Sequence, residues 1–569
     1  MRFRISLLHA FTLYTIMMSE TSSYLQIHPV DNVWVALKNL PGGTLIKHND
    51  DVFELVTPVE AKHKFTISTL NTNDEIYMYG VLVGKASQPI ARGAAITVNN
   101  VYHASTDFTL GERKTTWEKP DTEEFAKKTF MGYHRSNGEV GTANYWLVIP
   151  LVFCENRNVT VLKEALYTRL GFEKPKGYEQ EVSDLIEMYK AGKTVEEILS
   201  AELQQSSPQQ QSFKLFPNID GVKFLNHELG CGGTRSDSDA LCGLLAGYIT
   251  HPNVAGATVL SLGCQHAQTD ILRAEIQKRD PQFNKSLIVL EQQQMGTENK
   301  LMKEALRQTF AGLMQANQLQ RSPAPLSKLC IGLECGGSDG FSGISANLAL
   351  GYLSDVMVAL GGSIILAEFP ELCGVEQDLS DRCLNEPMAQ RFMHLMRTYN
   401  AQAEAAGSGF YANPSPGNIR DGLITDAIKS AGAAKKGGTS PVTDVLDYPQ
   451  KVTQPGLNLL CTPGSDVEST TAEVAAGANI VLFTTGLGTP TGNPIVPVIK
   501  LSTNTALLNR MPDIIDIDCG PIISGEETIQ QTAHRILNYV IEVAGGNIKP
   551  KAVLLGQDDF IPWKRGVSL

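Results

Sequence analysis

The chain has 569 residues, of which 42% are hydrophobic and 19% are charged, and its formal net charge at pH 7 is −12. These values are typical of a globular protein with several domains, and the acidic balance excludes the broad basic surfaces that bind nucleic acids or anionic membranes. Ten cysteines over this length do not resemble a disulfide framework. They favour a reducing compartment, the cytoplasm, where thiols are free to act as ligands.

The first 23 residues are predicted to be a leader or a disordered extension. Two arginines precede an apolar run, as in a signal peptide, but the run contains His9 and Tyr14, and no small-residue cleavage site follows. We therefore expect that translation begins at Met18 or that the extension is disordered.

Residues 24–105 alternate between short apolar-polar runs and turn residues, which predicts a small all-β domain. A histidine in a strand is more often a core or surface residue than a ligand. His28 with Asp31, in IHPVDN, and His63, in AKHKF, are nevertheless the better candidates for a metal-binding or acid role. Residues 106–130 are polar and charged and predict a linker.

The rest of the chain predicts α/β domains built on parallel sheets. Apolar runs such as YWLVIPLVF are typical of buried parallel strands, and charged helical segments separate them. We expect a first α/β domain at 131–285 and a C-terminal α/β domain at 286–569. Within the first, residues 161–216 predict a helical insertion that ends in the exposed patch QQSSPQQQS.

One sequence pattern occurs twice in these domains. The segments GCGGTRSDSDALCGLLAGYI and ECGGSDGFSGISANLALGY have the same spacing from Cys-Gly-Gly to a Gly-Tyr pair, and then to a polar residue after the next strand. A shorter segment, PGSD, indicates a third copy. This spacing predicts strand–loop–helix–strand units, whose carboxyl ends are where open α/β sheets bind ligands. Four side chains fall at those ends: Cys231, Cys264, Cys335 and Glu368.

The second copy offers an anion site and a cluster of carboxylates. Its glycines allow a ligand to approach main-chain N–H groups, and Ser338 or Asp339 could cap the helix that faces it. Glu368 and Glu371 either raise the pKa of one another, which suits a general base, or hold a divalent cation; otherwise they form a solvated acidic loop. The spacing required for a dinucleotide fingerprint or a P-loop is absent.

Several long motifs resemble those of the altronate and galactarate dehydratase family: GYHRSNGEVGTANYWLVIP, HPNVAGATVLSLGC, GLECGGSDGFSGISAN and FTTGLGTPTGNPIVPVIKLSTNT. The front domain, with IHPVDNVWVAL and YGVLVGKASQPIARG, resembles the small β-clip (SAF) domain of these enzymes. Two departures stand out. NNVYHA retains only His103 where the family often has His-x-His-Asn, and EFPE replaces the usual ETPE.

The resemblance implies a hydro-lyase that converts D-altronate to 2-dehydro-3-deoxy-D-gluconate and water, in hexuronate catabolism, with Fe²⁺ or another divalent cation such as Mn²⁺. Removing the proton beside a carboxylate builds up an enediolate that a cation can stabilise. On this basis we assign roles as follows: catalysis to Glu368, Glu371 and His63; substrate binding to Arg235, Gly336, Gly337, Ser338 and Asp339; metal binding to His28, Asp31, Cys231, Cys264 and Cys335.

Three alternatives remain open. The substrate could be galactarate, or the enzyme could be a sulfo-lyase of the same architecture. The chain could also be a sugar-acid-binding module without activity, although the intact cysteines and glutamates at the strand ends argue against this. The expected partner is a small sugar acid, with neither nucleic acid nor membrane, and we expect a homo-oligomer.

Overall fold

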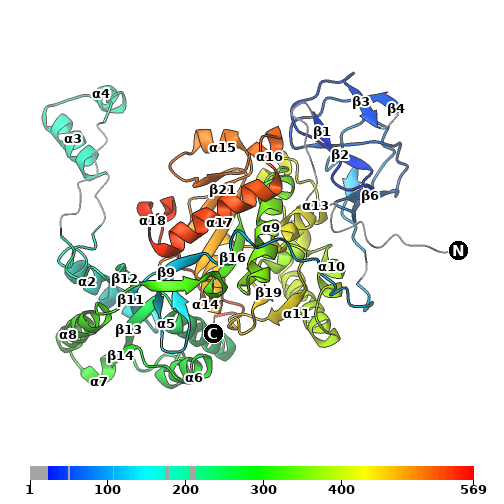
Figure 1. Ribbon diagram of the computed structural model, residues 1–569. Coiled ribbons are helices and arrows are strands. Elements are labelled where there is room, and N and C mark those ends of the chain that lie inside the picture. Colours follow the sequence, from blue (N-terminus) through cyan, green and yellow to red (C-terminus); the bar gives the residue numbers. More distant parts are fainter. Residues whose placement is uncertain (1–22, 49–50, 107, 174–177, 204–212, 569) are drawn as a thin grey trace.

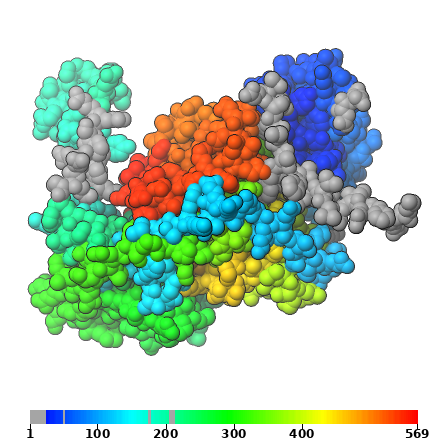
Figure 2. Space-filling view, in the orientation of Figure 1, coloured from blue at the N-terminus to red at the C-terminus, as the bar shows by residue number. Residues whose placement is uncertain are grey.

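The computed structural model describes residues 23–48, 51–106, 108–173, 178–203 and 213–568. The predicted leader, including Met18 but not Ser23, lies outside the described residues. Figure 2 shows the N-terminal domain as a lobe beside the larger body, and the helical insertion as a protrusion at the other end. None of the described helices is both long and apolar enough to cross a membrane.

The N-terminal domain is a small β-structure, as predicted. Its described residues form antiparallel sheets of order β1-β2-β5, β3-β4 and β6-β7-β8, around buried side chains such as Trp34, Phe65 and Ile76. The strands are β1 (Tyr24–Leu25), β2 (Val33–Ala36), β3 (Leu45–His48), β4 (Asp51–Glu54), β5 (Lys64–Thr66), β6 (Glu75–Met78), β7 (Val81–Ala86) and β8 (Val101–Tyr102).

The segment that we expected to be a linker follows the surface of the C-terminal domain. The Thr109 backbone N–H donates to Gln377 Oε1 (2.8 Å), and Lys114 Nζ lies 2.7 Å from Asp381 Oδ2. Phe125 is buried near the end of the segment. These contacts hold the segment against the C-terminal domain as the chain leaves the N-terminal domain.

A parallel sheet of order β12-β11-β13-β14 forms the second domain. Its strands are β11 (Tyr145–Pro150), β12 (Gly221–Phe224), β13 (Val254–Ser261) and β14 (Ser286–Glu291), and its helices are α2 (Asn156–Leu166), α5 (Arg235–Thr250), α6 (Thr269–Arg279), α7 (Gln292–Met295) and α8 (Glu298–Ala316). Because β14 pairs with β13, this sheet extends past residue 285, where we had expected the C-terminal domain to begin.

Two helices of the insertion, α3 (Glu179–Lys190) and α4 (Val195–Leu199), have no buried residue. They stand apart from the body of the molecule in Figure 1. The predicted Gln/Ser/Pro patch lies outside the described residues.

A short antiparallel sheet links chain segments on either side of the second domain. β9 (Thr129–His134) pairs with β10 (Val140–Gly141) and also with β15 (Ser322–Pro325), which returns after the whole second domain. Strands from the beginning and from the end of the second domain therefore pair with each other.

The C-terminal domain is built on a seven-stranded sheet of order β18-β19-β17-β16-β20-β21-β22, in which every pair is parallel. Strands such as β19 and β20 are buried along their whole length, as expected when helices cover both faces. The strands are β16 (Cys330–Cys335), β17 (Ser363–Leu366), β18 (Val442–Leu446), β19 (Gly456–Leu460), β20 (Ile480–Thr485), β21 (Val498–Ser502) and β22 (Ile517–Asp518).

Helices surround this sheet (Figure 1). They are α9 (Ala346–Ala359), α10 (Glu376–Asp381), α11 (Glu386–Ala405), α12 (Pro416–Arg420), α13 (Asp426–Ala433), α14 (Asp466–Ala476), α15 (Thr505–Arg510), α16 (Pro521–Ser524), α17 (Ile529–Gly545) and α18 (Lys551–Leu555), together with a 3-10 turn, η4 (Phe369–Leu372). The mixed α/β class and the N-terminal β-domain are therefore confirmed.

The predicted repeats are present as β12–α5–β13, β16–α9–β17 and β19–α14–β20. From β16 the chain passes to β17 on one side and later returns to the other side of β16 as β20. The carboxyl end of β16 is therefore the switch point of the sheet, where open α/β sheets usually bind their ligands.

Candidate active site

Three possible ligand or acid-base side chains meet at this switch point. Cys335 is the last residue of β16, while Glu368 and Glu371 lie in the turn that follows β17. Cys335 Sγ lies 3.4 Å from Glu368 Oε2 and 3.0 Å from Glu371 Oε2, and all three side chains are buried. The structure thus brings together three of the residues that the sequence analysis had assigned to one site.

Two lysines complete the group. Lys436, just after α13, places Nζ 3.0 Å from Glu368 Oε2, and Lys429, within α13, places Nζ 2.6 Å from Glu371 Oε1. Lys436 is fully buried, and the side chain of Lys429 is only 10% exposed. We call Cys335, Glu368, Glu371, Lys429 and Lys436 the strand-end network.

The backbone around the network is shaped to bring carboxylates close together. Glu368 has a left-handed conformation (φ 60°), and its N–H donates to Thr462 Oγ1 at 2.7 Å. A side chain rarely adopts this conformation unless its surroundings hold it there. At Gly336, an added Cβ would lie 1.9 Å from Asp466 Oδ2, so only glycine allows that carboxylate to approach the turn.

Three more acids lie near the network: Glu334 and Glu473 are fully buried, and Asp466 is partly buried. Burial and the nearby Glu368 raise the pKa of both Glu334 and Glu473 well above its usual value. Burial, with Glu368 and Glu371 nearby, raises the pKa of Asp466 to about 7. Two lysines cannot neutralise all these carboxyl groups, so several of them hold protons in the folded protein.

The pKa shifts inside the network run in opposite directions. Burial, followed by repulsion from Glu371, raises the pKa of Glu368. Burial opposes ionisation of Glu371 as well, but Lys429 and Lys436 hold its pKa below the usual value. Burial and the two glutamates raise the pKa of Cys335 well above its usual value, so that residue is a thiol. Carboxyl groups whose environments differ in this way are typical of acid-base sites.

The donor set of Cys335, Glu368 and Glu371 is compact enough to hold a metal ion, since its ligand atoms lie within 4.8 Å of one another. A cation there, however, would compete with two ammonium groups that already occupy the carboxylates. The network is therefore better suited to holding and moving protons than to binding a metal.

A second compact group lies at the border of the N-terminal domain. His103 follows β8, Cys373 follows η4, and Asp426 begins α13, and their ligand atoms also lie within 4.8 Å of one another. His103 Nδ1 forms an ion pair with Asp426 Oδ1, which raises the pKa of the imidazole. Among the described residues, no lysine forms an ion pair with these three side chains. We call them the interface triad.

The interface triad suits a divalent cation better than the strand-end network does. An imidazole, a thiol and a carboxylate are ligands that zinc and iron accept, and a cation could replace the proton between His103 and Asp426. The two groups adjoin along the chain: Glu371 and Cys373 are two residues apart, and Asp426 and Lys429 are one helical turn apart.

The N-terminal domain is anchored firmly beside these groups. Lys62 Nζ lies 2.7 Å from Asp421 Oδ1 and 3.1 Å from Asp339 Oδ2, and Lys64 Nζ donates to the Gly422 carbonyl at 2.6 Å. A cavity of about 220 Å³ lies at this border. It is lined by residues of both domains, including His28, Tyr79, Val375 and Lys435.

Three residues assigned from the N-terminal domain occupy distinct places. His28 lines the border cavity. Asp31 is buried, and its carboxylate accepts the backbone N–H groups of His28, Tyr79 and Gly80, which holds a turn together. His63 Nε2 lies 3.0 Å from the Arg420 carbonyl, on the interface. None of the three joins the compact ligand groups of the described residues.

At the predicted anion site, the second Cys-Gly-Gly turn forms several hydrogen bonds within the protein, one of which uses a backbone N–H group of the turn. The Gly336 N–H donates to the Thr484 carbonyl, and the Gly337 carbonyl accepts from the N–H of Gly486. The Ser338 carbonyl accepts from Asn418 Nδ2 at 2.7 Å. Asp339 accepts hydrogen bonds from Thr503 and Asn504 in addition to its ion pair with Lys62.

The remaining predicted residues lie in the second domain. Arg235 is exposed at the first position of α5, and Cys231 and Cys264 are exposed thiols. Among the described residues, neither cysteine belongs to a compact ligand group with Cys335. The structure therefore divides the predicted cysteine ligands between two sheets, while His28 and Asp31 lie in the N-terminal domain.

The sequence analysis did not identify the two network lysines or two members of the interface triad, Cys373 and Asp426. The lysines had a detectable signal: they occur in AIKSAGAAKKGG, among small apolar residues where a charge is unusual. No local pattern connects His103 with a cysteine and an aspartate far along the chain.

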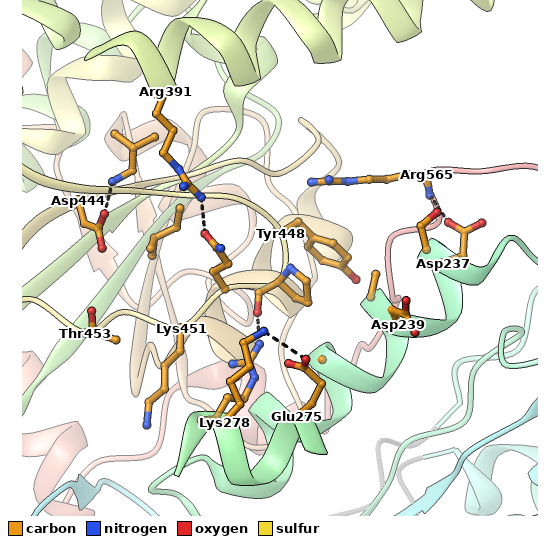
Figure 3. A pocket seen from close by; sticks show the side chains of 18 residues that line it. Asp237, Asp239, Glu275, Lys278, Arg391, Asp444, Tyr448, Lys451, Thr453 and Arg565 are labelled. Atoms are coloured by element: carbon orange, nitrogen blue, oxygen red, sulfur yellow. Dashed lines mark hydrogen bonds and ion pairs between the residues drawn. The ribbon is translucent and has the colours of Figure 1, made fainter. Parts of the chain in front are cut away.

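Figure 3 shows a separate hollow, with a volume of about 690 Å³, between the second and C-terminal domains. Its charged side chains bond to one another or to nearby polar groups: Lys278 pairs with Glu275, Arg391 donates to Gln450, and Arg565 pairs with Asp447. This hollow therefore offers few free charges to a ligand.

Comparison with known proteins agrees with this architecture. Residues 22–104 match the altronate/galactarate dehydratase SAF domain, residues 132–317 match the D-galactarate dehydratase/altronate hydrolase second domain, and residues 326–568 match the D-galactarate/altronate dehydratase C-terminal domain. The class that the fold and site define is thus a three-part α/β carbon–oxygen lyase with a SAF domain in front.

Relatives match over nearly the whole chain. The altronate dehydratase of Bacillus subtilis (strain 168) is 33% identical over 92% of this chain and 96% of its own length, and that of Escherichia coli (strain K12) is 32% identical over 96% and 100%. The galactarate dehydratase (L-threo-forming) of Escherichia coli (strain K12) is 31% identical over 93% and 94%. The chain belongs to the altronate/galactarate dehydratase family.

Proposed function

We propose that this protein dehydrates D-altronate to 2-dehydro-3-deoxy-D-gluconate, as a cytoplasmic step of hexuronate catabolism. The observation that carries the proposal is the buried strand-end network, where carboxylates and ammonium groups lie side by side at the switch point of the sheet. Near full-length similarity to two altronate dehydratases supports this choice of substrate.

The reaction removes the proton on C2 and the hydroxyl on C3. The electron pair of the C2–H bond forms a C2–C3 double bond, the hydroxyl leaves as water, and the resulting enol becomes the 2-keto acid. One group must accept a proton and another must donate one to the leaving hydroxyl. Paired carboxylates and ammonium groups in a water-poor site can do both.

We assign the proton-accepting role to Glu371, because its carboxylate is paired with Lys429 and lies beside the interface triad in the chain. Lys429 then stabilises negative charge as it develops on the substrate, and Lys436 holds Glu368 in place. In this scheme an acid beside the network, such as the partly buried Asp466, supplies the proton for the leaving hydroxyl.

The interface triad would hold the Fe²⁺ or Mn²⁺ that we propose as cofactor. When bound, such a cation acts as a Lewis acid that stabilises negative charge on the substrate oxygens. The residues fit this role because His103, Cys373 and Asp426 provide one nitrogen, one sulfur and one oxygen ligand within 4.8 Å.

The test is anaerobic turnover with added Fe²⁺ and reductant, comparing D-altronate, galactarate and (2R)-sulfolactate under identical conditions. We expect the 2-keto-3-deoxy product from D-altronate, and far slower formation of it by the Glu371→Gln protein prepared in the same way. If only galactarate or only sulfolactate were turned over, that compound would be the substrate in place of D-altronate. A relative named (2R)-sulfolactate sulfo-lyase subunit beta, 27% identical over 77% of this chain, makes the last comparison necessary.

No turnover of any of the three, with metal bound to the protein, would overturn the proposed reaction. We also propose that the protein is a homo-oligomer, and the oligomeric state can be measured on the same sample. Light scattering of the protein used for the assay measures it directly.

A further inference from the structure

Three cysteines of the second domain are exposed and share one edge of its sheet. Cys154, Cys231 and Cys264 are exposed, whereas the other cysteines of the described chain are partly or fully buried. They follow β11, β12 and β13, which are parallel neighbours in the order β12-β11-β13. The carboxyl ends of parallel neighbours meet at one edge, so the topology brings the three thiols to the same side of the sheet.

Backbone contacts join the three loops that carry these thiols. The Phe153 N–H donates to the Leu229 carbonyl at 3.0 Å, and the His266 N–H donates to the Gly230 carbonyl at 3.1 Å. Cys154 directly follows Phe153, Cys231 directly follows Gly230, and Cys264 comes two residues before His266. Gly230 has φ +97°, and an added Cβ would lie 2.3 Å from the Leu151 carbonyl oxygen, so the loops pack tightly.

A buried histidine fixes two of the loops. His227 Nδ1 accepts the Leu229 N–H at 3.1 Å, so Nε2 carries the ring proton and donates to the Pro150 carbonyl at 2.7 Å. Burial lowers the pKa of His227 to about 4, which keeps the ring neutral. Both of its nitrogens are engaged, so His227 positions the thiol loops and is not a ligand.

Side chains join the third loop, which carries Cys264, to its neighbours. Gln293, which follows β14, places Nε2 3.2 Å from Cys264 Sγ, and His266 Nδ1 lies 3.3 Å from the Gly233 carbonyl. The Cys264 sulfur therefore already accepts a hydrogen bond from the neighbouring strand end. Donors of this kind orient thiolate ligands and tune the metal that they hold.

The spacing of the thiols favours one kind of occupant. A single metal ion with bonds to sulfur of about 2.3 Å needs sulfur atoms roughly 4 Å apart. Among the described residues, these thiols do not form a ligand group within 4.8 Å. An iron–sulfur cluster accepts a wider spacing, because each thiolate binds a different iron.

We propose that Cys154, Cys231 and Cys264 hold a [4Fe–4S] cluster at the carboxyl edge of the second-domain sheet. Three thiolates would leave one iron without a protein ligand, at an edge where the thiols are exposed to solvent. An open iron of this kind binds hydroxyl and carboxylate oxygens, so small hydroxy acids are the ligand class that it would take. This site is separate from the strand-end network and does not depend on the function proposed above.

The experiment is anaerobic reconstitution of the full-length protein with Fe²⁺ and sulfide, followed by removal of unbound ions. We expect about four acid-labile sulfides per chain, about four irons in addition to any iron held by the interface triad, and the broad visible absorption of thiolate–iron charge transfer. The Cys154→Ser, Cys231→Ser and Cys264→Ser proteins should each lose more than half of the bound sulfide and absorption. Circular dichroism and thermal unfolding confirm that the variants are folded.

Cys373→Ser is the matched control, because it removes a thiol of the interface triad and should keep the full sulfide content. Iron bound without sulfide would overturn the cluster. So would sulfide that is retained in all three variants, or a Cys231–Cys264 disulfide in the anaerobic protein. Because sulfide is measured without any substrate, these outcomes are independent of whether altronate is turned over.

Discussion

The two Cys-Gly-Gly turns share their spacing but lie in opposite environments. In the C-terminal domain, Cys335 is 2% exposed and touches two glutamates that are paired with lysines. In the second domain, Cys231 is exposed at the end of a four-stranded sheet. The same local unit therefore produces a buried acid-base network in one domain and an open edge of thiols in the other.

The difference comes from what covers each strand end. The turn after β16 lies beneath η4 and α13 and beside the N-terminal domain, whose Lys62 reaches Asp339. Burial in such surroundings strengthens every charge–charge interaction, so the carboxylates need partners and several hold protons. Without such a cover, the second-domain thiols stay open to solvent and to ligands.

The largest expected effect is on the buried network. Glu371→Gln removes the proposed proton acceptor while preserving the shape of the side chain, and kcat should fall by about 10²- to 10⁴-fold. Steady-state kinetics with the proposed substrate measures this, with Glu404→Gln on the exposed face of α11 as the control. A change of less than threefold (roughly, within assay variation) would exclude Glu371 from acid-base catalysis.

The next prediction concerns stability. Lys436→Met leaves Glu368 buried without its partner, which should lower the free energy of unfolding by about 3–5 kcal/mol. Denaturant unfolding measures the loss. Combining Lys436→Met with Glu368→Gln removes both charges and should recover a large part of the lost stability. If the double variant is as unstable as Lys436→Met, the ion pair is not the cause.

The pH dependence of stability should contain a contribution from Asp466. Folding raises the pKa of Asp466 from 3.8 to about 7, mainly through burial and then through repulsion from Glu368 and Glu371, while Lys429 lowers it. Between these values the unfolded chain has lost a proton that the folded chain keeps, so the contribution of Asp466 to stability falls as pH rises from about 4 to 7. Asp466→Asn should remove this fall. Thermal unfolding across that pH range compares the two proteins, and parallel curves would contradict the prediction.

The smallest effects compare the two turns directly. In metal-free protein, Cys335→Ala should cost about 1–3 kcal/mol of unfolding free energy, because it removes a buried hydrogen-bond donor from two carboxylates. Cys231→Ala at the exposed turn should change it by less than about 0.5 kcal/mol. Equal losses in the two variants would show that burial does not distinguish the turns.

Much of the fold could be predicted from local patterns. Alternating short strands indicated the N-terminal β-domain, and long apolar runs indicated buried parallel strands, because those patterns reflect which faces of a strand are covered. The repeated spacing also placed Cys335 and Glu368 at neighbouring strand ends, which the pairing of β16 with β17 explains. The predicted domain boundary at 285 missed β14, since pairing with β13 is a contact between distant segments.

The sequence by itself determined the class of the fold, the repeated unit and the family, since each depends on patterns along the chain. Only the tertiary structure decided which chemistry each repeat carries. It brought Lys429 and Lys436 to the carboxylates, joined His103 to Cys373 and Asp426 across a domain border, and left Cys231 and Cys264 exposed. Charge pairing and burial depend on packing between distant segments, which no local spacing records.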